Sequence, residues 1–317
     1  MILILTSIGD VSSDLVVDWL DYYKHKYLRI NSFDLFEKKV IINLQNSNVN
    51  ISIDNRKLDL DEINVVWFRK FGYFDNSDLF ERISNNFDTN IANHLSKEFH
   101  KILYFFLLAL KDKRWLTNPF TLNLNKLDVL RIASMCGLST PNSTIINEMN
   151  MENINMVVKS VYDPILMNYN GNNFLTYTNL FSFDDLNNIS NEFFPSLIQT
   201  KIEKKYEVRV FYLMGKCYSM AIFSQNDPQT EIDFRRYNWI NPNRFLPYKL
   251  PKQECIKIRN LMKKINLNCG SIDLIKGLDD KYYFLEVNPT GQFGMVDFPC
   301  NYGIHCKLAK TLMNFDK

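Results

Sequence analysis

The most informative part of the sequence is Ser271-Ile-Asp-Leu-Ile275 followed by Tyr282-Tyr-Phe-Leu-Glu-Val-Asn-Pro289. Both stretches are mainly apolar and predict two strands of a hairpin. Residues i and i+2 of a strand point to the same face, so Glu286 and Asn288 project together, and Asp273 can join them from the neighbouring strand. Three oxygen donors on one face suit Mg²⁺, which usually binds one or two carboxylates together with substrate phosphates. The alternative is the polar face of a half-solvated sheet.

Working outward, the first third of the chain alternates predicted strands and helices. The predicted strands are Ile2–Leu5, Tyr27–Ile30 and Asn64–Phe68, and a long helix is predicted over Asn90–Leu110. Ser12 or Ser13 is expected to cap the helix after the first strand. A tight hairpin is predicted around Asp54-Asn55. This alternation predicts an open α/β domain over residues 1–117.

The remainder of the chain predicts two further domains, at 118–194 and 195–317. A helix over Leu124–Cys136 is expected to end with Gly137 as its C-cap. Short strands then predict a small α+β unit. After Pro195, a meander is predicted from Leu197–Ile202, Glu207–Met214 and Lys216–Ser224, with Gly215 at a tight turn.

The composition excludes several classes of protein. The 317 residues are 46% hydrophobic, which excludes a wholly disordered chain. With 37 basic and 35 acidic residues the net charge is +2, which argues against nucleic acid or anionic membrane as the main partner. The six cysteines contain no Cys-x-x-Cys pair, which favours a reducing cytoplasm. We expect neither a signal peptide nor a transmembrane helix, because no run of about 18 apolar residues occurs.

The spacing of Asp273, Glu286 and Asn288 resembles the magnesium site of ATP-grasp ligases. Further motifs resemble that family in the same order along the chain: Asn125-Lys-Leu-Asp128, Val157-Val-Lys159, Gln199-Thr-Lys-Ile202 and Tyr206-Glu-Val-Arg-Val210. The resemblance implies a three-domain ATP-grasp fold with α/β and α+β parts. It also implies that ATP lies between the central and C-terminal domains, with Mg²⁺ bound beside it.

A narrower resemblance, over nearly the whole chain, is to graspetide synthetases of the grasp-with-spasm and microviridin type. It is carried by Ile2-Leu-Ile-Leu-Thr6, Val66-Trp-Phe-Arg-Lys70 and Asp233-Phe-Arg-Arg-Tyr237. It implies an ATP-dependent macrocyclase that joins Asp or Glu side chains to Thr, Ser or Lys side chains of a ribosomally made precursor peptide. The implied partner is that peptide, leader and core, and relatives suggest a homodimer. The residue pairs that are joined, their order, and ester or amide chemistry stay open.

By this resemblance, Lys126 and Lys159 hold the ATP phosphates. A lysine in an apolar strand is costly to bury without an anionic partner, which a polyphosphate would provide. The alternative is a strand-end lysine that reaches water. Gly171 could serve a phosphate-covering loop, although its Asn-Gly sequence also predicts a plain turn.

Gln199, Lys201 and Ile202 are expected to line the adenine pocket, mainly through their backbone. Glu203 or Glu207 would accept hydrogen bonds from the ribose, and Glu207 is favoured because it shares a strand face with Arg209. The run Glu203-Lys204-Lys205 also fits a solvated turn.

Arg209, Asp233 and Arg235 are the predicted catalytic residues. Arg209 would stabilise charge on the transferring phosphoryl group or on an acyl phosphate. On a strand, Asp233 and Arg235 would share a face, so Arg235 could bind a substrate carboxylate while Asp233 takes the proton of the nucleophile. The alternative is an exposed ion pair of little consequence. Arg236 is the weaker candidate, and the choice between the two arginines stays open.

Three other functions fit the sequence less well. The first is a ligase of the same fold that adds amino acids to a peptide or protein terminus. The second is a non-catalytic module that binds ATP or a peptide, which the presence of Lys159, Asp273, Glu286 and Asn288 disfavours. The third is a nucleic-acid-binding protein, which would need a local basic groove.

Overall fold

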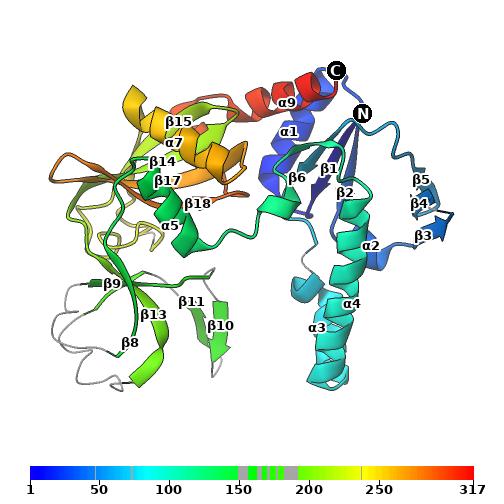
Figure 1. Cartoon of the computed structure of the whole chain (residues 1–317), viewed down its shortest axis with the longest axis horizontal. Coiled ribbons are helices and arrows are strands. Elements are labelled where there is room, and N and C mark those ends of the chain that lie inside the picture. Colours follow the sequence, from blue (N-terminus) through cyan, green and yellow to red (C-terminus); the bar gives the residue numbers. More distant parts are fainter. Residues whose placement is uncertain are drawn as a thin grey trace. The chain divides into compact units, whose positions relative to one another are not determined.

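A computed structural model describes residues 1–46, 48–72, 74–148, 156–162, 166–169, 172–175, 178–181, 192–236 and 238–317 (Figure 1). Its contacts form two compact units. The first contains Met1–Leu122, Gln292–Asp297 and Gly303–Lys317, and the second contains Asn123–Gly291 and Phe298–Tyr302. The domain boundaries at 117 and 194 stay predictions. The division does show that the C-terminal segment Gly303–Lys317 belongs to the same unit as the N-terminus.

The first unit is built on a four-stranded parallel sheet in the order β2-β1-β6-β7. Its strands are β1 (Ile2–Thr6), β2 (Tyr27–Asn31), β6 (Val65–Phe68) and β7 (Arg114–Leu116). Its helices are α1 (Val11–Tyr22), α2 (Asp34–Glu37), α3 (Asp78–Asn86), α4 (Thr89–Leu108) and α9 (Ile304–Phe315), with short 3-10 turns at Phe74–Asn76 and Pro119–Thr121. Strand β1 is completely buried, as expected for a parallel strand covered on both faces. The predicted open α/β domain is therefore confirmed.

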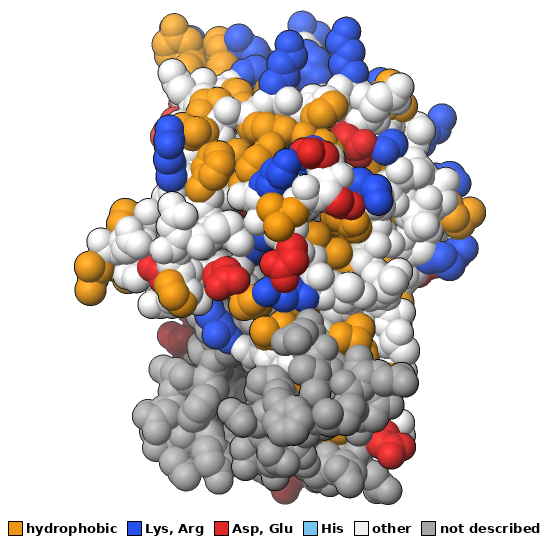
Figure 2. Space-filling view, turned by 90° about the vertical axis from the view of Figure 1, so that its left-hand side faces the viewer, with side chains coloured by type: hydrophobic (Ala, Val, Ile, Leu, Met, Phe, Trp, Pro, Cys, Tyr) orange, Lys and Arg blue, Asp and Glu red, His pale blue; other side chains and the backbone are white. Residues whose placement is uncertain are grey.

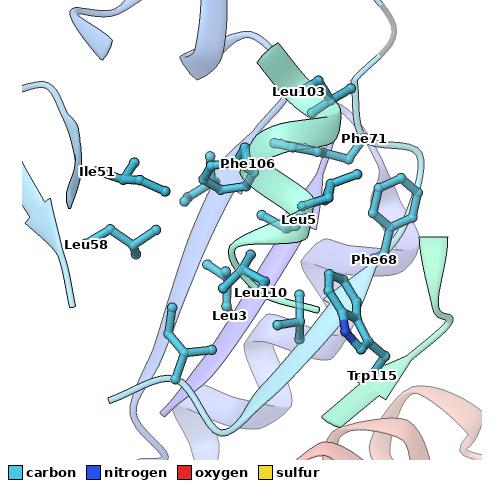
Figure 3. Close-up of a cluster of buried hydrophobic side chains, with 14 residues drawn as sticks. Leu3, Leu5, Ile51, Leu58, Phe68, Phe71, Leu103, Phe106, Leu110 and Trp115 are labelled. Atoms are coloured by element: carbon cyan, nitrogen blue, oxygen red, sulfur yellow. The ribbon is translucent and has the colours of Figure 1, made fainter. Parts of the chain in front are cut away.

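A small antiparallel sheet contributes to the same core. It consists of β3 (Val40–Gln45), β4 (Asn48–Ile53) and β5 (Arg56–Leu58) in that order. Asp54 and Asn55 both have positive φ, 53° and 62°, and form the predicted hairpin turn. Ile51 and Leu58 of this sheet lie in the cluster that Figure 3 shows, with side chains from β1, β6, β7 and α4.

The predicted cap of α1 is wrong. The helix begins at Val11, with Asp10 in the cap position and no side-chain capping bond. Ser12 and Ser13 lie inside the first turn and are buried. Ser13 donates to the Asp10 carboxylate, and Ser12 donates to Oε1 of Gln292 at 3.0 Å. Their hydroxyls thus serve tertiary contacts, which a capping rule based on local sequence does not include.

The second unit begins with α5 (Lys126–Met135), whose C-cap is Cys136 and not the predicted Gly137. Gly137 is the next residue and ends the helix in the left-handed region at φ 82°. Its first sheet has the order β12-β9-β13-β8. The strands are β8 (Ser143–Glu148), β9 (Met156–Lys159), β12 (Asn179–Leu180) and β13 (Glu192–Thr200). A separate antiparallel hairpin is formed by β10 (Leu166–Tyr169) and β11 (Asn172–Leu175). Gly171 lies outside the described residues.

The second sheet of this unit has the order β16-β15-β14-β17-β18. Its strands are β14 (Lys204–Leu213), β15 (Lys216–Phe223), β16 (Arg244–Tyr248), β17 (Cys269–Gly277) and β18 (Tyr282–Asn288), accompanied by α7 (Lys252–Lys264), and α8 (Gly294–Cys300) follows β18. One face is apolar: Val208, Val210, Ile272, Leu274 and Phe284 are at most 1% exposed. Because side chains alternate along a strand, the residues between them point to the opposite face.

The predicted meander is partly wrong. The β14–β15 hairpin with Gly215 at its turn (φ 86°) and the β17–β18 hairpin are confirmed. Strand β13, however, pairs with β8 and β9 and not with β14. The three residues Lys201–Glu203 carry the chain from one sheet into the other. Sequential strands usually pair, so local pattern alone favoured the wrong neighbour.

Charged side chains of both signs are mixed with apolar ones in the middle of the face in Figure 2. In the described part of the chain, no helix is both long and apolar enough to cross a membrane. All six cysteines are free thiols.

Candidate active site

Three charged side chains form a row across the second sheet: Arg209 in β14, Asp273 in β17 and Glu286 in β18. In the antiparallel register, Asp273 lies opposite Arg209 on one side and opposite Glu286 on the other. Directly opposed residues share a face, so the three side chains project together. The Nη1 atom of Arg209 donates to Oδ2 of Asp273. A regular period-two pairing would place Asp273 opposite Leu285, so the shared face of the two carboxylates depends on an irregularity in β18.

A β-bulge lies beside the two carboxylates. The pairing passes from Asp273–Glu286 to Leu274–Phe284, so Leu285 is an extra residue in β18. Bulges bend a strand, increase its twist, and are frequent next to active sites because they redirect side chains. The bulge therefore sets the direction of Glu286 at the end of β18.

Asn288 lies two residues beyond Glu286, opposite Ser271. Its Oδ1 accepts the backbone N–H of Thr290 at 3.1 Å, and its carbonyl accepts that of Gly291 at 3.2 Å. A Cβ at Gly291 would lie 2.6 Å from Cβ of Ser271, so this tight turn needs glycine. The turn fixes Asn288 on the face that carries Glu286.

Two lysines converge on Glu286. Lys126 is the first residue of α5, and its Nζ lies 3.2 Å from Oε2 of Glu286 and donates to the carbonyl of Ser160 at 2.9 Å. Lys159 is the last residue of β9. Burial lowers the pKa of Lys159, and the Glu286 carboxylate is the largest opposing influence. The structure thus brings both predicted phosphate lysines to the carboxylate row.

The two carboxylates of the row differ in their titration. Burial raises the pKa of Asp273, although Arg209 acts in the opposite direction. Burial also acts on Glu286, but Lys126 and Lys159 outweigh it, and the pKa of Glu286 is lowered. Opposite shifts of neighbouring groups are typical of functional sites.

The donor set fits a magnesium–phosphate pair. The part of the chain that the structure describes contains no group of three or more His, Cys, Asp or Glu side chains suited to a metal. Asp273, Glu286 and Asn288 offer two carboxylates and one amide, which suits Mg²⁺ that also binds phosphate oxygens. The Nε of Arg209 is buried and has no acceptor. An anion beside the metal would supply one, because a buried donor without a partner is costly.

The predicted adenine hinge covers the end of β13 and the connection to β14. Gln199 is 2% exposed, and its side-chain amide donates to Oγ of Ser143 at 2.8 Å. Lys201 pairs with Glu203 at 3.0 Å, while Ile202 is half-buried. The side chain of Gln199 is therefore engaged between strands, and adenine recognition through the backbone of this segment stays a prediction.

Glu207 is buried at the start of β14. It forms an ion pair with Lys204 and accepts from Oγ of Ser224 at 3.2 Å. Burial raises the pKa of Glu207, and Lys204 opposes the rise. The possible solvated turn at Lys204 is therefore wrong, because its side chain is only 7% exposed. A second bulge, at Lys205, brings Lys204 to the face of Glu207, which strict alternation would not.

Asp233 and Arg235 form a close pair, but not on a strand. The prediction of a shared strand face is wrong, because residues 231–236 form bends and turns. Asp233 is buried and accepts from the backbone N–H of Arg235 at 3.1 Å, from its Nε at 2.8 Å and from its Nη2 at 2.6 Å. Burial would raise the pKa of Asp233, but the hydrogen bonds and charge of Arg235 outweigh it and lower that pKa. Arg236 instead donates to Asn179, so Arg235 is the partner of Asp233.

The charges of the carboxylate row also act on Arg235. Its pKa is raised, first by the hydrogen bond to Asp233, and also by the charges of Glu286 and Asp273. The second unit thus gathers Lys126, Lys159, Arg209 and Arg235 around two acidic side chains. Such a site can bind a polyanion and a carboxylate together.

Comparison with known proteins identifies one family match and several similar structures. Residues 1–122 match the family described as the MvdD pre-ATP grasp domain. A RiPP-associated ATP-grasp ligase from Chryseobacterium gregarium, in complex with ADP and a leader and core peptide, is 25% identical with a TM-score of 0.84, over 99% of this chain and 96% of that one. Macrocyclase MdnC from Microcystis aeruginosa MRC, bound with precursor peptide MdnA, is 26% identical with a TM-score of 0.80, over 99% of each chain.

The ATP-grasp ligase PsnB, complexed with a minimal precursor, Mg and ADP, shares the fold at 17% identity and a TM-score of 0.79, over 100% of this chain and 97% of that one. No curated protein matches the sequence. The N-terminal family and the whole-chain similarity to these peptide ligases agree with the site that the second unit builds. Residues 1–122 thus match an MvdD pre-ATP grasp domain, and the chain over almost its whole length is similar to ATP-grasp ligases bound with precursor peptides.

Proposed function

We propose that this protein is an ATP- and Mg²⁺-dependent macrocyclase. It would join Asp or Glu side chains of a ribosomally made precursor peptide to Thr, Ser or Lys side chains as ω-esters or ω-amides. The observation that carries the proposal is the convergence of Lys126, Lys159 and Arg209 on Asp273 and Glu286. The similar structures that hold ADP and precursor peptides support it.

In this proposal, the phosphates of ATP are held by Lys126, Lys159 and Arg209. Mg²⁺ is held by Asp273, Glu286 and Asn288. These six residues follow one another along the chain in the same order as the family motifs. Bound there, Mg²⁺ would neutralise charge on the phosphate oxygens. In the structure the cations pair with the carboxylates. Nucleotide and metal would exchange these partners, so that the lysines contact phosphate and the carboxylates contact the metal.

The nucleoside would lie on the β13–β14 connection. The backbone of Gln199, Lys201 and Ile202 would bind adenine, and Glu207 would accept hydrogen bonds from the ribose. One oxygen of Glu207, Oε1, contacts both Lys204 and Ser224. Its other oxygen remains for the sugar.

The peptide chemistry would proceed in two steps. An oxygen of the substrate carboxylate attacks the γ-phosphorus of ATP, so ADP leaves and an acyl phosphate forms. The hydroxyl or amine then attacks the acyl carbon, gives up its proton to a carboxylate such as Asp233, and phosphate leaves. Arg235 would orient the substrate carboxylate, and Arg209 would stabilise charge on the transferring phosphoryl group. The lowered pKa of Asp233 keeps it ionised and able to accept a hydrogen bond from the nucleophile.

Co-expression with a candidate precursor, a short peptide rich in Thr, Ser or Lys and in Asp or Glu from a neighbouring reading frame, tests this function. Mass spectrometry is expected to show the loss of one water for each crosslink. A gain of amino-acid residues would instead identify a ligase that extends a terminus and would overturn the macrocyclase. Glu286→Gln is expected to abolish the mass change. Its matched control is Asp280→Asn, an exposed carboxylate in the turn of the same hairpin.

We further infer that the enzyme acts as a homodimer in a reducing cytoplasm, without nucleic acid or membrane as a partner. The family resemblance supports the dimer, and the six free thiols support the compartment. Light scattering of the purified protein tests the dimer, and a monomer at micromolar concentration would contradict it. Binding of DNA or RNA at low salt would contradict the choice of partner.

A further inference from the structure

Residues 224–236 and 238–243 lie outside the sheet between β15 and β16 and carry Asp233 and Arg235; we call them the arm. Lys204 attaches its middle to the sheet, because its Nζ pairs with Glu207 and also donates to the carbonyl of Ile232 at 3.3 Å. Ser224, at the start of the arm, bonds to the same Glu207 carboxylate. A buried charge pair thus holds the residue that directly precedes Asp233.

The base of the arm is closed by a buried hydroxyl. Thr230 is completely buried, and its Oγ1 lies 3.0 Å from the carbonyl of Ser224 and 3.1 Å from Oδ1 of Asn243. Asn243 in turn lies within reach of the carbonyl of Phe234, at 3.5 Å. The two ends of the arm are therefore tied together and to its centre.

The tip of the arm is also held by hydrogen bonds. Oδ1 of Asn238 accepts the backbone N–H groups of Ile240 and Asn241 at 2.9 and 3.2 Å. Its Nδ2 donates to Oδ2 of the buried Asp227 at 2.6 Å. On this support, Trp239 is 87% exposed and Ile240 is 96% exposed. They are the two most exposed large hydrophobic side chains in the described part of the chain.

We propose that Trp239 and Ile240 are a docking surface for the precursor peptide, where they receive an aromatic or aliphatic side chain close to the acidic residue that reacts. Adjacent apolar side chains held in solvent on a braced backbone are typical of a binding surface, and tryptophan is enriched at the energetic centres of interfaces. The peptide is the occupant because the same arm carries Arg235, which the proposed function assigns to the substrate carboxylate. The inference therefore rests on that function.

The length of the arm limits which peptide residue is recognised. Trp239 follows Arg235 by four residues, so their Cα atoms are at most about 14 Å apart. An extended peptide advances about 3.3 Å per residue. The recognised side chain therefore lies within about four positions of the reacting Asp or Glu.

Steady-state kinetics of the full-length enzyme with its precursor peptide and Mg-ATP tests the surface. Trp239→Ser/Ile240→Ser is expected to raise the KM for the peptide at least about tenfold, which corresponds to about 1.4 kcal/mol. The KM for ATP and the melting temperature are expected to stay unchanged. Leu278→Ser is the matched control, because Leu278 is 61% exposed in the turn between β17 and β18 of the same unit. An unchanged peptide KM would overturn the proposal.

A second copy of the chain is the competing occupant. If the double variant turns a dimer into a monomer while the peptide KM stays constant, the surface belongs to self-association and the proposal is wrong. If the wild-type enzyme modifies no encoded peptide, the proposed function fails, and that result is visible before any variant is made.

Peptide variants give an independent readout. Replacing the apolar residue within four positions of the acid by Ser should raise the wild-type KM by about the same factor of ten. It should add little in the Trp239→Ser/Ile240→Ser enzyme, because the two changes remove one contact. Fully additive effects would refute direct contact.

A pair of lysine variants tests whether the contacts of Lys204 hold the arm in position. Lys204→Met is expected to raise the peptide KM, whereas Lys205→Met should not, since the Lys205 side chain is 37% exposed and pairs only with Asp280 among its described ionic partners. Should Lys204→Met fail to fold, Thr230→Val removes the hydroxyl at the base of the arm without changing its shape and is expected to raise the same KM. A normal peptide KM in folded Thr230→Val would contradict the bracing role.

Discussion

Replacing Arg69 with Met is expected to destabilise the first unit strongly. Arg69 is 3% exposed and Asp10 is 5% exposed, and Nε of the arginine lies 2.7 Å from Oδ2 of the aspartate. Burial would raise the pKa of Asp10, but Arg69 and Ser13 outweigh it and the pKa of Asp10 is lowered. The aspartate is therefore charged at neutral pH, and the variant would leave that charge buried.

Breaking a buried ion pair from one side costs about 3–5 kcal/mol. The guanidinium of Arg69 also lies 5.0 Å from the ring centroid of Phe293 and 3.3 Å from Oε1 of Gln292, and both contacts are lost with it. A loss of 1 kcal/mol lowers Tm by about 2–4 °C in domains of roughly 150–250 residues. The expected fall in Tm is therefore about 6–20 °C.

Thermal unfolding followed by circular dichroism at pH 7 measures the effect. Arg82→Met is the matched control, because Arg82 is exposed on α3 of the same unit. Asp10→Asn/Arg69→Met should recover at least half of the loss, since the amide keeps hydrogen bonds without a buried charge. A loss below about 1 kcal/mol for Arg69→Met, or a double variant no more stable than the single one, would refute the reasoning.

The difference in stability between the wild type and Arg69→Met should depend on pH in one direction. In the wild type, the pKa of Asp10 is lowered, so its contribution is complete above its ordinary value of 3.8 and is lost as the pH falls through the lowered pKa. In Arg69→Met, burial without a partner would raise that pKa, so the carboxyl becomes neutral at a higher pH. The stability gap between the two proteins should therefore narrow on acidification.

Further predictions concern the site and the C-terminal helix. Glu286→Gln should lower turnover at least about 100-fold, and Asp280→Asn should leave turnover unchanged. The rate of product formation with Mg-ATP measures both effects. A loss of turnover below about tenfold in Glu286→Gln would contradict its role as a metal ligand. Gly291→Ala should cost about 1–3 kcal/mol, because its Cβ would lie 2.6 Å from Ser271; an unchanged Tm would show that the turn relaxes. Burial would raise the pKa of Asp297, but the hydrogen bonds it accepts outweigh burial and lower that pKa. The wild type should therefore lose stability as the pH falls through the lowered pKa, and Asp297→Asn should flatten the plot of stability against pH. Equal slopes of that plot for the two proteins would argue against this contribution.

Much of the candidate site could be placed from the sequence because it depends on short-range periodicity. The β17–β18 hairpin is contiguous, and alternation brings Glu286 and Asn288 to one face, whereas the bulge at Leu285 places Glu286 opposite Asp273. The first α/β unit and the Asp54-Asn55 turn are local in the same way. The family motifs added Lys126 and Lys159, which no local pattern connects with Glu286.

Other features depend on irregularities that alternation does not encode. The bulge at Lys205 reverses the face of Lys204 and turns an apparent surface lysine into the buried partner of Glu207. The arm holds Asp233 and Arg235 in turns, so their pairing comes from side-chain bonds and not from a strand. The sequence contained a weak signal, because Glu207 lies three residues after Lys204, but that spacing predicts opposite faces in a regular strand.

The sequence alone predicted the two strands that carry Asp273, Glu286 and Asn288, because apolar runs mark both strands and alternation puts Glu286 and Asn288 on one face. The bulge at Leu285, which brings Glu286 to the face of Asp273, is visible only in the structure. Only the tertiary structure decided which distant groups meet this hairpin. Arg209 reaches it through strand order, Lys126 through the docking of α5, and Arg235 through the arm. The physical reason is that strand periodicity is a property of neighbouring residues, whereas charge partners in a buried site are selected by packing between segments far apart in the chain.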